Sequence, residues 1–233
     1  MSPRPRGAPR RTAPRRDIPD ACVERLSLYV RELDTLIRQR VGFVSSSRLA
    51  KPLGLTDAQV RRDLSYFGQF GTSGRGYEVQ RLHGRLTGIL GVSGRTWHVA
   101  LAGIGNLGSA LLAYRGFQER GFLFRVAVDT DPQKIGRVVQ GLTVAPVSDL
   151  ARLVRQEDVH IGMLAVPTPA AQTVCDQLVQ HGIRAIVNFA PVRLDVPAGV
   201  HLRTVDLAME LEGLSFYLAR GMRPHAAGRS HGG

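Results

Sequence analysis

The sequence lacks the features that mark a secreted, disulfide-stabilised or membrane-spanning protein. Its 233 residues include only two cysteines, Cys22 and Cys175, and these have neither the spacing of a metal site nor that of a disulfide framework. No apolar run reaches the length of a membrane span, and the arginine- and proline-rich start holds no apolar segment of the kind that a secretory signal needs. We therefore expect a cytoplasmic protein with no metal and no membrane partner.

Acidic residues are scarce at the front of the chain. Residues 1–95 contain 18 basic and 8 acidic side chains, a net charge of +10, whereas residues 96–233 contain 13 and 11, a net charge of +2. Residues 1–16 hold six arginines and no acid, which predicts a disordered tail that either adds phosphate contacts or is simply solvated. The charge difference predicts a polyanion as the partner of the first part and a small ligand for the second.

A glycine-rich turn follows the apolar alternation of residues 98–102. The run Gly103-Ile104-Gly105-Asn106-Leu107-Gly108 leads into a helical pattern, and a second apolar run, residues 123–128, ends in Asp129. In such a unit the first glycine allows a tight turn, the second lets the backbone approach a pyrophosphate, and the third lets helix and strand pack closely. Asp129, with Asp131 as a substitute, can accept hydrogen bonds from ribose hydroxyls, which favours NAD(H) over NADP(H).

Apolar and helical segments then alternate as an open parallel sheet requires. We expect strands at residues 142–144, 159–166 and 183–187 and helices at residues 148–156 and 170–180. Two sequences follow strands at the edge where such sheets bind ligands. They are Val166-Pro167-Thr168-Pro169 and Asn188-Phe189-Ala190-Pro191. Phe189 is either a ring that stacks on a flat ligand or, as its spacing favours, a core residue.

The basic part predicts a helix-turn-helix. A first helix is expected over residues 19–39, and a short helix capped by Ser46 or Ser47 is expected to reach Leu53, where Pro52 discourages continuation. Gly54 ends this helix, and the sequence from Thr56 to Gln59 is typical of a capping box. The helix that follows has a basic and polar outer face, which is typical of a recognition helix. Its outward residues are Gln59, Arg61, Arg62 and Ser65.

Glycines are dense in residues 70–79, where aromatic and β-branched residues flank them. This pattern predicts a hairpin directly after the recognition helix, in other words a wing, with Arg75 at its tip. A further helix is expected over residues 80–90, and residues 91–94 are typical of a linker.

The last helix is apolar on more than one side. It begins at Asp206, a good N-cap. One stripe holds Leu207, Leu211, Leu214 and Leu218, and other faces hold Met209, Phe216 and Tyr217. Such a helix needs a second surface to bury it, which predicts a homodimer, the form in which helix-turn-helix proteins read two-fold operators.

These motifs, in this order, resemble those of the Rex family of redox-sensing transcriptional repressors. The resemblance covers about residues 19–220 and is carried by four sequences: AQVRRDLSYFG at 58–68, the glycine turn, DTDPQKIG at 129–136, and NFAP at 188–191. The sequence departs from the family pattern at Pro52, where a helix former is usual. It also departs at Thr72 and Ser73, where a basic pair is common and where this chain has Arg75 further on.

The resemblance implies an α/β homodimer in which winged helix-turn-helix domains precede Rossmann-type doubly wound parallel sheets and the last helices are exchanged between chains. It also implies a repressor that holds operator DNA while NADH is low and releases it when NADH, the inducer ligand, rises, with NAD+ as a competing ligand. By motif match, Tyr114 and Asp206 resemble the family's residues near the nicotinamide, linked to the switch.

The candidates form two groups on a chain of four segments. The cofactor-binding candidates are Gly103, Ile104, Gly105, Asn106, Leu107, Gly108, Tyr114, Asp129, Asp131, Lys134, Pro167, Thr168, Asn188, Phe189 and Asp206. The DNA-binding candidates are Ser46, Ser47, Gln59, Arg61, Arg62, Ser65, Tyr66, Arg75 and Tyr77. The segments are a disordered basic tail (1–16), a winged-helix domain (17–91), a Rossmann domain with its dimerisation helix (92–221) and a disordered tail (222–233).

Two other functions stay open. A small NAD-dependent oxidoreductase is disfavoured because the sheet pattern takes up residues 96–203, which leaves no substrate domain and no evident acid-base pair of histidine or lysine. Ordinary surface or structural roles are commoner for histidines at strand or helix ends, where His98, His160, His181 and His201 fall. A regulatory module that binds CoA or another nucleotide can have a similar glycine turn, but Asp129 would repel the ribose 3′-phosphate of CoA.

Overall fold

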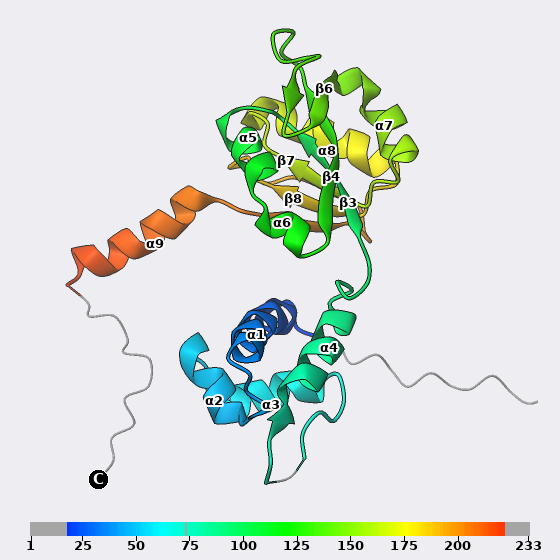
Figure 1. The fold of residues 1–233 in the computed structure, drawn as a ribbon. Coiled ribbons are helices and arrows are strands. Elements are labelled where there is room, and N and C mark those ends of the chain that lie inside the picture. The colour runs from blue at the N-terminus through cyan, green and yellow to red at the C-terminus, as the bar shows by residue number, and fades with distance from the viewer. Residues whose placement is uncertain (1–17, 73, 222–233) are drawn as a thin grey trace, which may run out of the picture. The chain divides into compact units, whose positions relative to one another are not determined.

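The structure is a computed structural model that describes residues 18–72 and 74–221 (Figure 1). The chain forms two compact units that divide between Ser93 and Gly94, two residues beyond the predicted boundary. The two predicted tails and Ser73 lie outside the described residues. Among the helices that the structure describes, none combines the length and the apolar character that crossing a membrane requires.

The first unit contains the predicted helices and a two-stranded sheet. Its elements are α1 (Asp20–Arg38), β1 (Phe43–Val44), α2 (Ser46–Ala50), the 3-10 helix η1 (Lys51–Leu53), α3 (Asp57–Ser65), β2 (Tyr77–Glu78) and α4 (Val79–Ile89). Apolar residues at helical spacing bury one side of α1, α3 and α4 in a common core. This core includes Leu26, Val30, Leu33, Val60, Leu64, Leu82 and Leu86.

The cap of α2 differs from the predicted one. Ser45, rather than Ser46 or Ser47, caps this helix, because its side-chain oxygen accepts a hydrogen bond from the backbone N–H of Arg48 at 3.1 Å. Ser46 and Ser47 are instead the first helical residues. Pro52 lies in η1 near its start, where its missing N–H interrupts no helical hydrogen bond.

The turn into α3 agrees with the prediction except for one side chain. Gly54 ends η1 with a φ of 66°, in the left-handed region that favours glycine. Thr56 caps α3 by accepting a hydrogen bond from the backbone N–H of Gln59 at 3.1 Å. The capping box is nevertheless incomplete, because the Gln59 amide donates to Asp63 at 2.8 Å instead of reaching back to the N-cap.

The predicted hairpin over residues 70–79 is confined to its tip. A single bridge joins Thr72 and Gly76, and β2 pairs antiparallel with β1, which precedes α2 in the chain. Gly76 has a φ of 81°, and a Cβ there would lie 2.5 Å from the carbonyl oxygen of Val44. Glycine therefore lets the chain turn close against β1, and the wing is a short loop on that small sheet.

The second unit is a seven-stranded sheet with helices on both faces. Its strands are β3 (Trp97–Ala102), β4 (Phe122–Asp129), β5 (Val138–Val139), β6 (Leu142–Pro146), β7 (Ile161–Leu164), β8 (Ala185–Asn188) and β9 (His201–Thr204). Its helices are α5 (Asn106–Ala113), α6 (Gly116–Glu119), η2 (Val147–Asp149), α7 (Leu150–Gln156), α8 (Thr168–Gln180) and α9 (Leu207–Ala219). The strand order is β5-β6-β4-β3-β7-β8-β9, and every neighbouring pair except β5 and β6 is parallel. The six parallel strands therefore have the order of the doubly wound Rossmann fold, as predicted.

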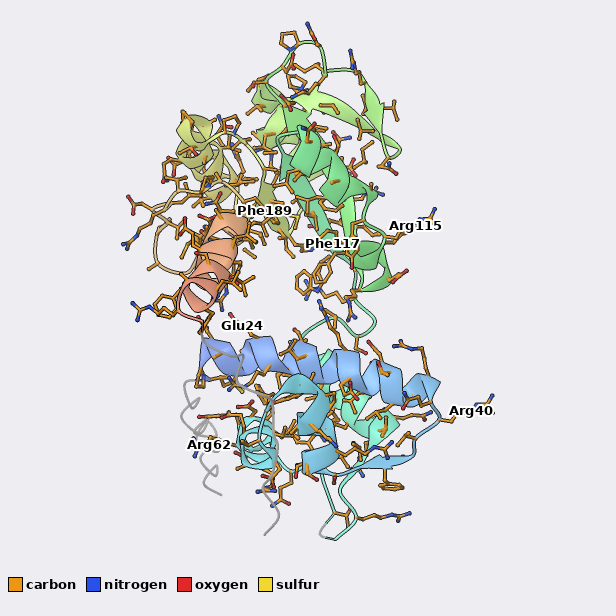
Figure 2. All side chains as sticks on the ribbon, turned by 90° about the vertical axis from the view of Figure 1, so that its left-hand side faces the viewer. Glu24, Arg40, Arg62, Arg115, Phe117 and Phe189 are labelled. Carbon is orange, nitrogen blue, oxygen red and sulfur yellow. The ribbon has the colours of Figure 1, made fainter. Side chains whose placement is uncertain are left out.

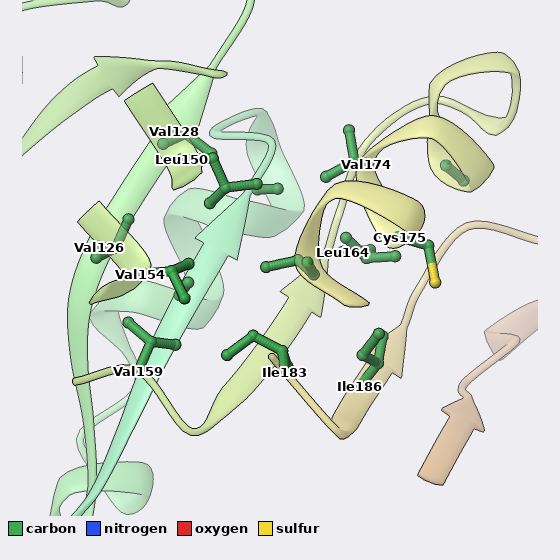
Figure 3. Close-up of a cluster of buried hydrophobic side chains, with 14 of the residues drawn as sticks. Val126, Val128, Leu150, Val154, Val159, Leu164, Val174, Cys175, Ile183 and Ile186 are labelled. Carbon is green, nitrogen blue, oxygen red and sulfur yellow. The ribbon is translucent and has the colours of Figure 1, made fainter. Parts of the chain in front are cut away.

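Strand β3 shows how the sheet separates two cores. Ala100 and Ala102 belong to the core that α7 and α8 cover, whereas Val99 and Leu101 belong to the core on the opposite face. In the first of these cores, side chains of β4, β7 and β8 pack against the two helices (Figure 3). The labelled residues include Val126, Leu150, Leu164, Val174 and Ile186.

Two short edge strands of the second unit, β5 and β9, are missing from the predicted pattern, and the helix predicted after the glycine turn is divided in two. Strands β5 and β9 lie at the two edges of the sheet, and the residues of β9 are half-buried or exposed, so its sequence shows no apolar run. The predicted helix after the glycine turn stops at Ala113 because Tyr114 is extended, with a ψ of 103°, and the chain resumes helical structure in α6.

The last helix begins where the sequence predicts. The Asp206 side chain accepts hydrogen bonds from the backbone N–H groups of Ala208 at 2.9 Å and Met209 at 3.3 Å. All 13 residues of α9 are exposed in the single chain, among them Leu218 at 82%. Among the described residues, none covers its apolar faces.

A buried ion pair ties α3 to α1. The carboxylate of Asp63 is 1% exposed and accepts hydrogen bonds from Arg25 at 2.6 and 2.8 Å and from the Tyr29 hydroxyl at 2.7 Å, besides that from Gln59. Burial opposes ionisation of this carboxyl, but the donors outweigh burial, so the pKa of Asp63 lies below its ordinary value. The orientation of α3 therefore depends on a charge that is matched inside the unit.

Replacing Arg25 with methionine is expected to destabilise the first unit by about 3 kcal/mol at pH 7, because Asp63 stays buried without its cation. Since the folded-state pKa of Asp63 is depressed, the pair stabilises the fold above about pH 4, and this contribution disappears as the pH falls through the folded-state pKa. The free energies of unfolding of R25M and wild type should therefore differ less at pH 3 than at pH 7. Urea unfolding followed by circular dichroism measures the free energy of unfolding at both pH values. Arg31→Met, on the same helix, is the control. Equal losses in R25M and R31M would contradict the assignment.

Candidate functional site

A cavity of about 470 Å³ opens at the carboxyl ends of the central strands β3 and β7. The strand order reverses between these neighbours, which is where doubly wound sheets bind their ligands. The lining comes from the glycine turn, the end of β4 and the segments that follow β7 and β8. Nine predicted cofactor-binding residues line it: Gly103, Gly105, Leu107, Asp129, Asp131, Lys134, Pro167, Thr168 and Phe189.

The three glycines of the turn differ in what a side chain would meet. Gly103 has a φ of 92°, and a Cβ there would collide with the carbonyl oxygen of Ala165 after β7. A Cβ on Gly108 would collide with the carbonyl oxygen of Gly103 beneath α5. Nothing lies within 4 Å of the position of a Cβ on Gly105, which lines the cavity. The first and third glycines therefore serve packing, and the second leaves room beside the cavity.

The carboxylate of Asp129 holds the glycine turn. It is 7% exposed and accepts hydrogen bonds from the backbone N–H groups of Ile104 at 2.7 Å and Asp131 at 2.9 Å. Lys134 Nζ lies 3.2 Å from Asp129 and 3.6 Å from Asp131. Burial opposes ionisation, but these donors outweigh it and keep the pKa of Asp129 below its ordinary value. The cavity therefore has an ionised carboxylate in its lining at pH 7.

Four predicted cofactor-binding residues lie outside the cavity lining and support it or flank it. Ile104 is buried and acts through its backbone N–H, Gly108 is buried under the turn, and Asn106 is the exposed first residue of α5. Asn188 is fully buried, and its amide is hydrogen-bonded to the backbone of Ala190 and Val192 at 2.9 to 3.0 Å. Its side chain thus shapes the loop that carries Phe189, the ring labelled in Figure 2.

Tyr114 and Asp206, the residues expected near the nicotinamide, do not line this cavity in the single chain. Tyr114 is 63% exposed and borders a second, smaller cavity of about 320 Å³ with Phe117 and Phe124. Asp206 caps α9. The sequence also missed lining residues such as Val147 and Ala170, which reach the cavity only because of the sheet order.

The two arginines on the outer face of α3 differ in whether their guanidinium groups are already hydrogen-bonded. Arg61 forms an ion pair with Asp57 and donates to the Ser46 hydroxyl at 3.2 Å. Arg62 is exposed (Figure 2), and its guanidinium forms no hydrogen bond or ion pair with any residue that the structure describes. Ser65 is exposed and donates to the backbone carbonyl of Arg62 at 2.7 Å. Arg62 is therefore the arginine of α3 with its donors still available.

Two predicted DNA-binding residues have contacts within the first unit. Tyr77 is 9% exposed because its ring packs in the core of the first unit, and the amide of Gln59 is engaged by Asp63. In the wing, Arg75 is exposed and its guanidinium lies 4.1 Å from the centre of the Phe43 ring. Two further candidates, Ser47 at the start of α2 and Tyr66 after α3, are exposed and half-buried, respectively.

The fold and the two sites define a two-domain protein in which a winged-helix DNA-binding domain precedes a Rossmann-type dinucleotide-binding domain. Models of known families match each part. The model described as "Putative DNA-binding protein N-terminus" matches residues 17–65, and the one described as "CoA binding domain" matches residues 94–192.

Relatives over most of the chain identify the family. The redox-sensing transcriptional repressor Rex of Desulfitobacterium hafniense is 49% identical over 199 residues, which are 85% of this chain and 94% of that protein. Structures of RSP, a Rex-family repressor, in complex with beta-NAD+ and operator DNA and in complex with beta-NADH match with TM-scores of 0.84 and 0.80. They are 35% and 34% identical, and each match covers 88% of this chain and 94% and 96% of theirs. The chain belongs to the Rex family of redox-sensing transcriptional repressors.

The glycine turn yields a contrast in stability. Gly108→Ala is expected to lower the free energy of unfolding of the ligand-free second unit by about 2 kcal/mol, because the new methyl group meets backbone. Gly105→Ala should cost about 1 kcal/mol or less, because its methyl group meets nothing. Urea unfolding followed by the fluorescence of Trp97, the one tryptophan in the sequence, measures both. A loss in G105A as large as that in G108A would contradict the steric account.

Proposed function

We propose that this protein is a cytoplasmic, redox-sensing transcriptional repressor that binds operator DNA as a homodimer and releases it when NADH occupies the cavity. The observation that carries the proposal is the combination of parts in one chain. An exposed recognition helix with an available Arg62 is joined to a glycine-turn cavity that contains the ionised Asp129. The names of the relatives, and the RSP complexes with operator DNA and with both cofactors, support the same function.

The charges in the cavity favour NAD(H) as the ligand. Asp129 and Asp131 with Lys134 between them leave the ribose end of the cavity with a net negative charge. Carboxylates accept hydrogen bonds from ribose hydroxyls and repel a ribose phosphate. The backbone N–H groups at the start of α5 supply the opposite, positive end of a helix dipole for the pyrophosphate.

Discrimination between NADH and NAD+ follows from the apolar part of the lining. Phe189, Ala190 and Pro191, which follow β8, line the cavity together with Pro167 and Val147. The cofactors differ by one positive charge on the nicotinamide ring. Enclosing a charged ring among apolar side chains costs more than enclosing a neutral one, so NADH is the preferred ligand and NAD+ a weaker competitor.

The dimer supplies what the single chain leaves incomplete. The apolar residues of α9 are exposed, and neither Tyr114 nor Asp206 lines the cavity of its own chain. A partner that covers α9 would bury these apolar residues. It would also bring the groups that resemble the family's switch residues close to a nicotinamide. A two-fold dimer would present two α3 helices, one for each half-site of a two-fold operator.

Catalysis is not part of the proposed function. Among the described residues that line the cavity there is no histidine, cysteine or tyrosine. Its ionisable side chains, Asp129, Asp131 and Lys134, form a single ion-paired cluster. CoA is a second candidate ligand, since the family model that matches residues 94–192 describes a CoA binding domain. The two carboxylates oppose the 3′-phosphate of CoA.

Titrating cofactors into the DNA complex tests the proposal. A labelled duplex that carries a two-fold operator from the region upstream of the protein's own gene is bound at fixed salt, because phosphate contacts depend on ionic strength. NADH should release the duplex at concentrations where NAD+ and CoA release little of it. A ligand shifts the equilibrium between the DNA-bound and DNA-free arrangements only if it binds the two with different affinities. Tight DNA binding that NADH does not change would contradict the redox-sensing role. Release by CoA alone would favour the CoA-binding module. The absence of specific DNA binding would favour an oxidoreductase.

The two neighbouring arginines of α3 should differ in their effect on DNA. Arg62→Ala is expected to weaken operator binding about tenfold or more, the usual worth of a good arginine contact to a base. Arg61→Ala should weaken it less, because Asp57 and Ser46 already occupy that guanidinium. Fluorescence anisotropy at fixed salt measures both, with Arg31→Ala on α1 as the control. An R61A effect equal to or larger than that of R62A would contradict this assignment.

A further inference from the structure

A cluster of two histidines and an aspartate lies at the end of the sheet opposite the cavity. His98 is the second residue of β3, His160 directly precedes β7, and Asp158 lies in the turn between α7 and His160. Each offers one ligand atom, and the three atoms lie within 4.8 Å of one another. We propose that this cluster binds one divalent transition metal ion of the zinc type.

The ring of His98 is oriented as a metal ligand usually is. Its Nδ1 lies 2.8 Å from the backbone carbonyl oxygen of Glu157, so Nδ1 carries the proton and Nε2 keeps its lone pair. Histidines that bind metals commonly donate their second ring N–H to a carbonyl or carboxylate in this way. The carbonyl thus sets the tautomer that coordination needs.

Asp158 places a carboxylate where the backbone favours glycine. It has a φ of 47°, in the left-handed region, directly after Glu157, the C-cap of α7. Glycine or asparagine is the usual residue at that position. Its side chain is 84% exposed, and its carboxylate lies 3.6 Å from Nε2 of His160. The sequence therefore accepts an unfavourable backbone conformation and gains an acid beside the histidines.

His160 is half-buried against two neighbouring rings. Its ring is 22% exposed and packs edge-on against Trp97 at 5.3 Å and against His98 at 5.5 Å between centroids. Nδ1 accepts a hydrogen bond from the backbone N–H of His98 at 3.2 Å. Coordination through Nε2 requires the ring proton on Nδ1, so the backbone N–H of His98 gives up this acceptor when the ion binds.

The ligand chemistry selects the metal class. Two imidazole nitrogens and one carboxylate oxygen, with a fourth position for water, suit Zn²⁺ and its neighbours, whereas Mg²⁺ and Ca²⁺ prefer oxygen ligands alone. The bound ion would join the amino ends of β3 and β7 to the turn after α7. Because it binds the folded unit only, it should also stabilise that unit against unfolding.

Zinc titration of the full chain tests the site. The protein, without an affinity tag and stripped with EDTA, carries His225→Gln and His231→Gln so that histidines outside the described residues do not contribute. Competition for Zn²⁺ with a chromogenic chelator gives stoichiometry and affinity, and Co²⁺ gives a visible spectrum that reports nitrogen and oxygen ligands in tetrahedral geometry. One zinc ion per chain is expected, together with a rise in the unfolding temperature of the second unit.

Matched variants decide the assignment. Asp158→Asn keeps a residue that tolerates the left-handed backbone and removes the charge, and His160→Gln removes the enclosed ligand. Each should lower zinc affinity at least tenfold, whereas Asp195→Asn and His201→Gln, at exposed positions elsewhere in the unit, should leave it unchanged. If H160Q fails to fold, D158N alone decides. Zinc affinity unchanged in D158N, or no zinc binding by the background protein at micromolar concentrations, would overturn the proposal.

Discussion

A buried, ionised carboxylate at the functional element of each unit is the interaction on which both sites depend. Asp129 accepts the backbone N–H of Ile104 and thereby fixes the glycine turn against the end of β4. Asp63 does the same for the recognition helix by binding Arg25 and Tyr29 of α1. Both carboxyls have a depressed pKa because their donors outweigh the cost of burial. Removing the partner of such a charge is expensive, so turn and helix each keep one orientation.

The sequence predicts features that local chemistry determines. The glycine turn, the alternation of strands and helices after it and the Asp206 cap follow from residues close together in the chain, and all three are present in the structure. Long-range partners could not be predicted in this way. Asp63 meets Arg25 across 38 residues. His98 and His160 meet across 62, and β2 pairs with a strand that precedes α2. The alternating sequence around Tyr77 predicted a strand of the wing with an exposed ring. In the structure this ring packs in the core of the first unit.

The arrangement separates reading DNA from reading the cofactor. Arg62, whose donors are available, lies on α3 of the first unit, and the cavity lies at the switch point of the second. A cofactor can change DNA affinity only if it binds the DNA-competent and DNA-incompetent arrangements with different affinities. The exposed apolar residues of α9 give the proposed dimer a surface through which the two units of one chain can influence those of its partner.

The coupling between the two sites has a direct thermodynamic test, because linkage between two ligands is reciprocal. The dissociation constant of NADH is measured by fluorescence for the free protein and for the protein saturated with operator duplex, at one salt concentration. The account predicts weaker NADH binding on DNA, by the same factor by which NADH weakens operator binding. Equal NADH affinity in the presence and absence of operator DNA would contradict it.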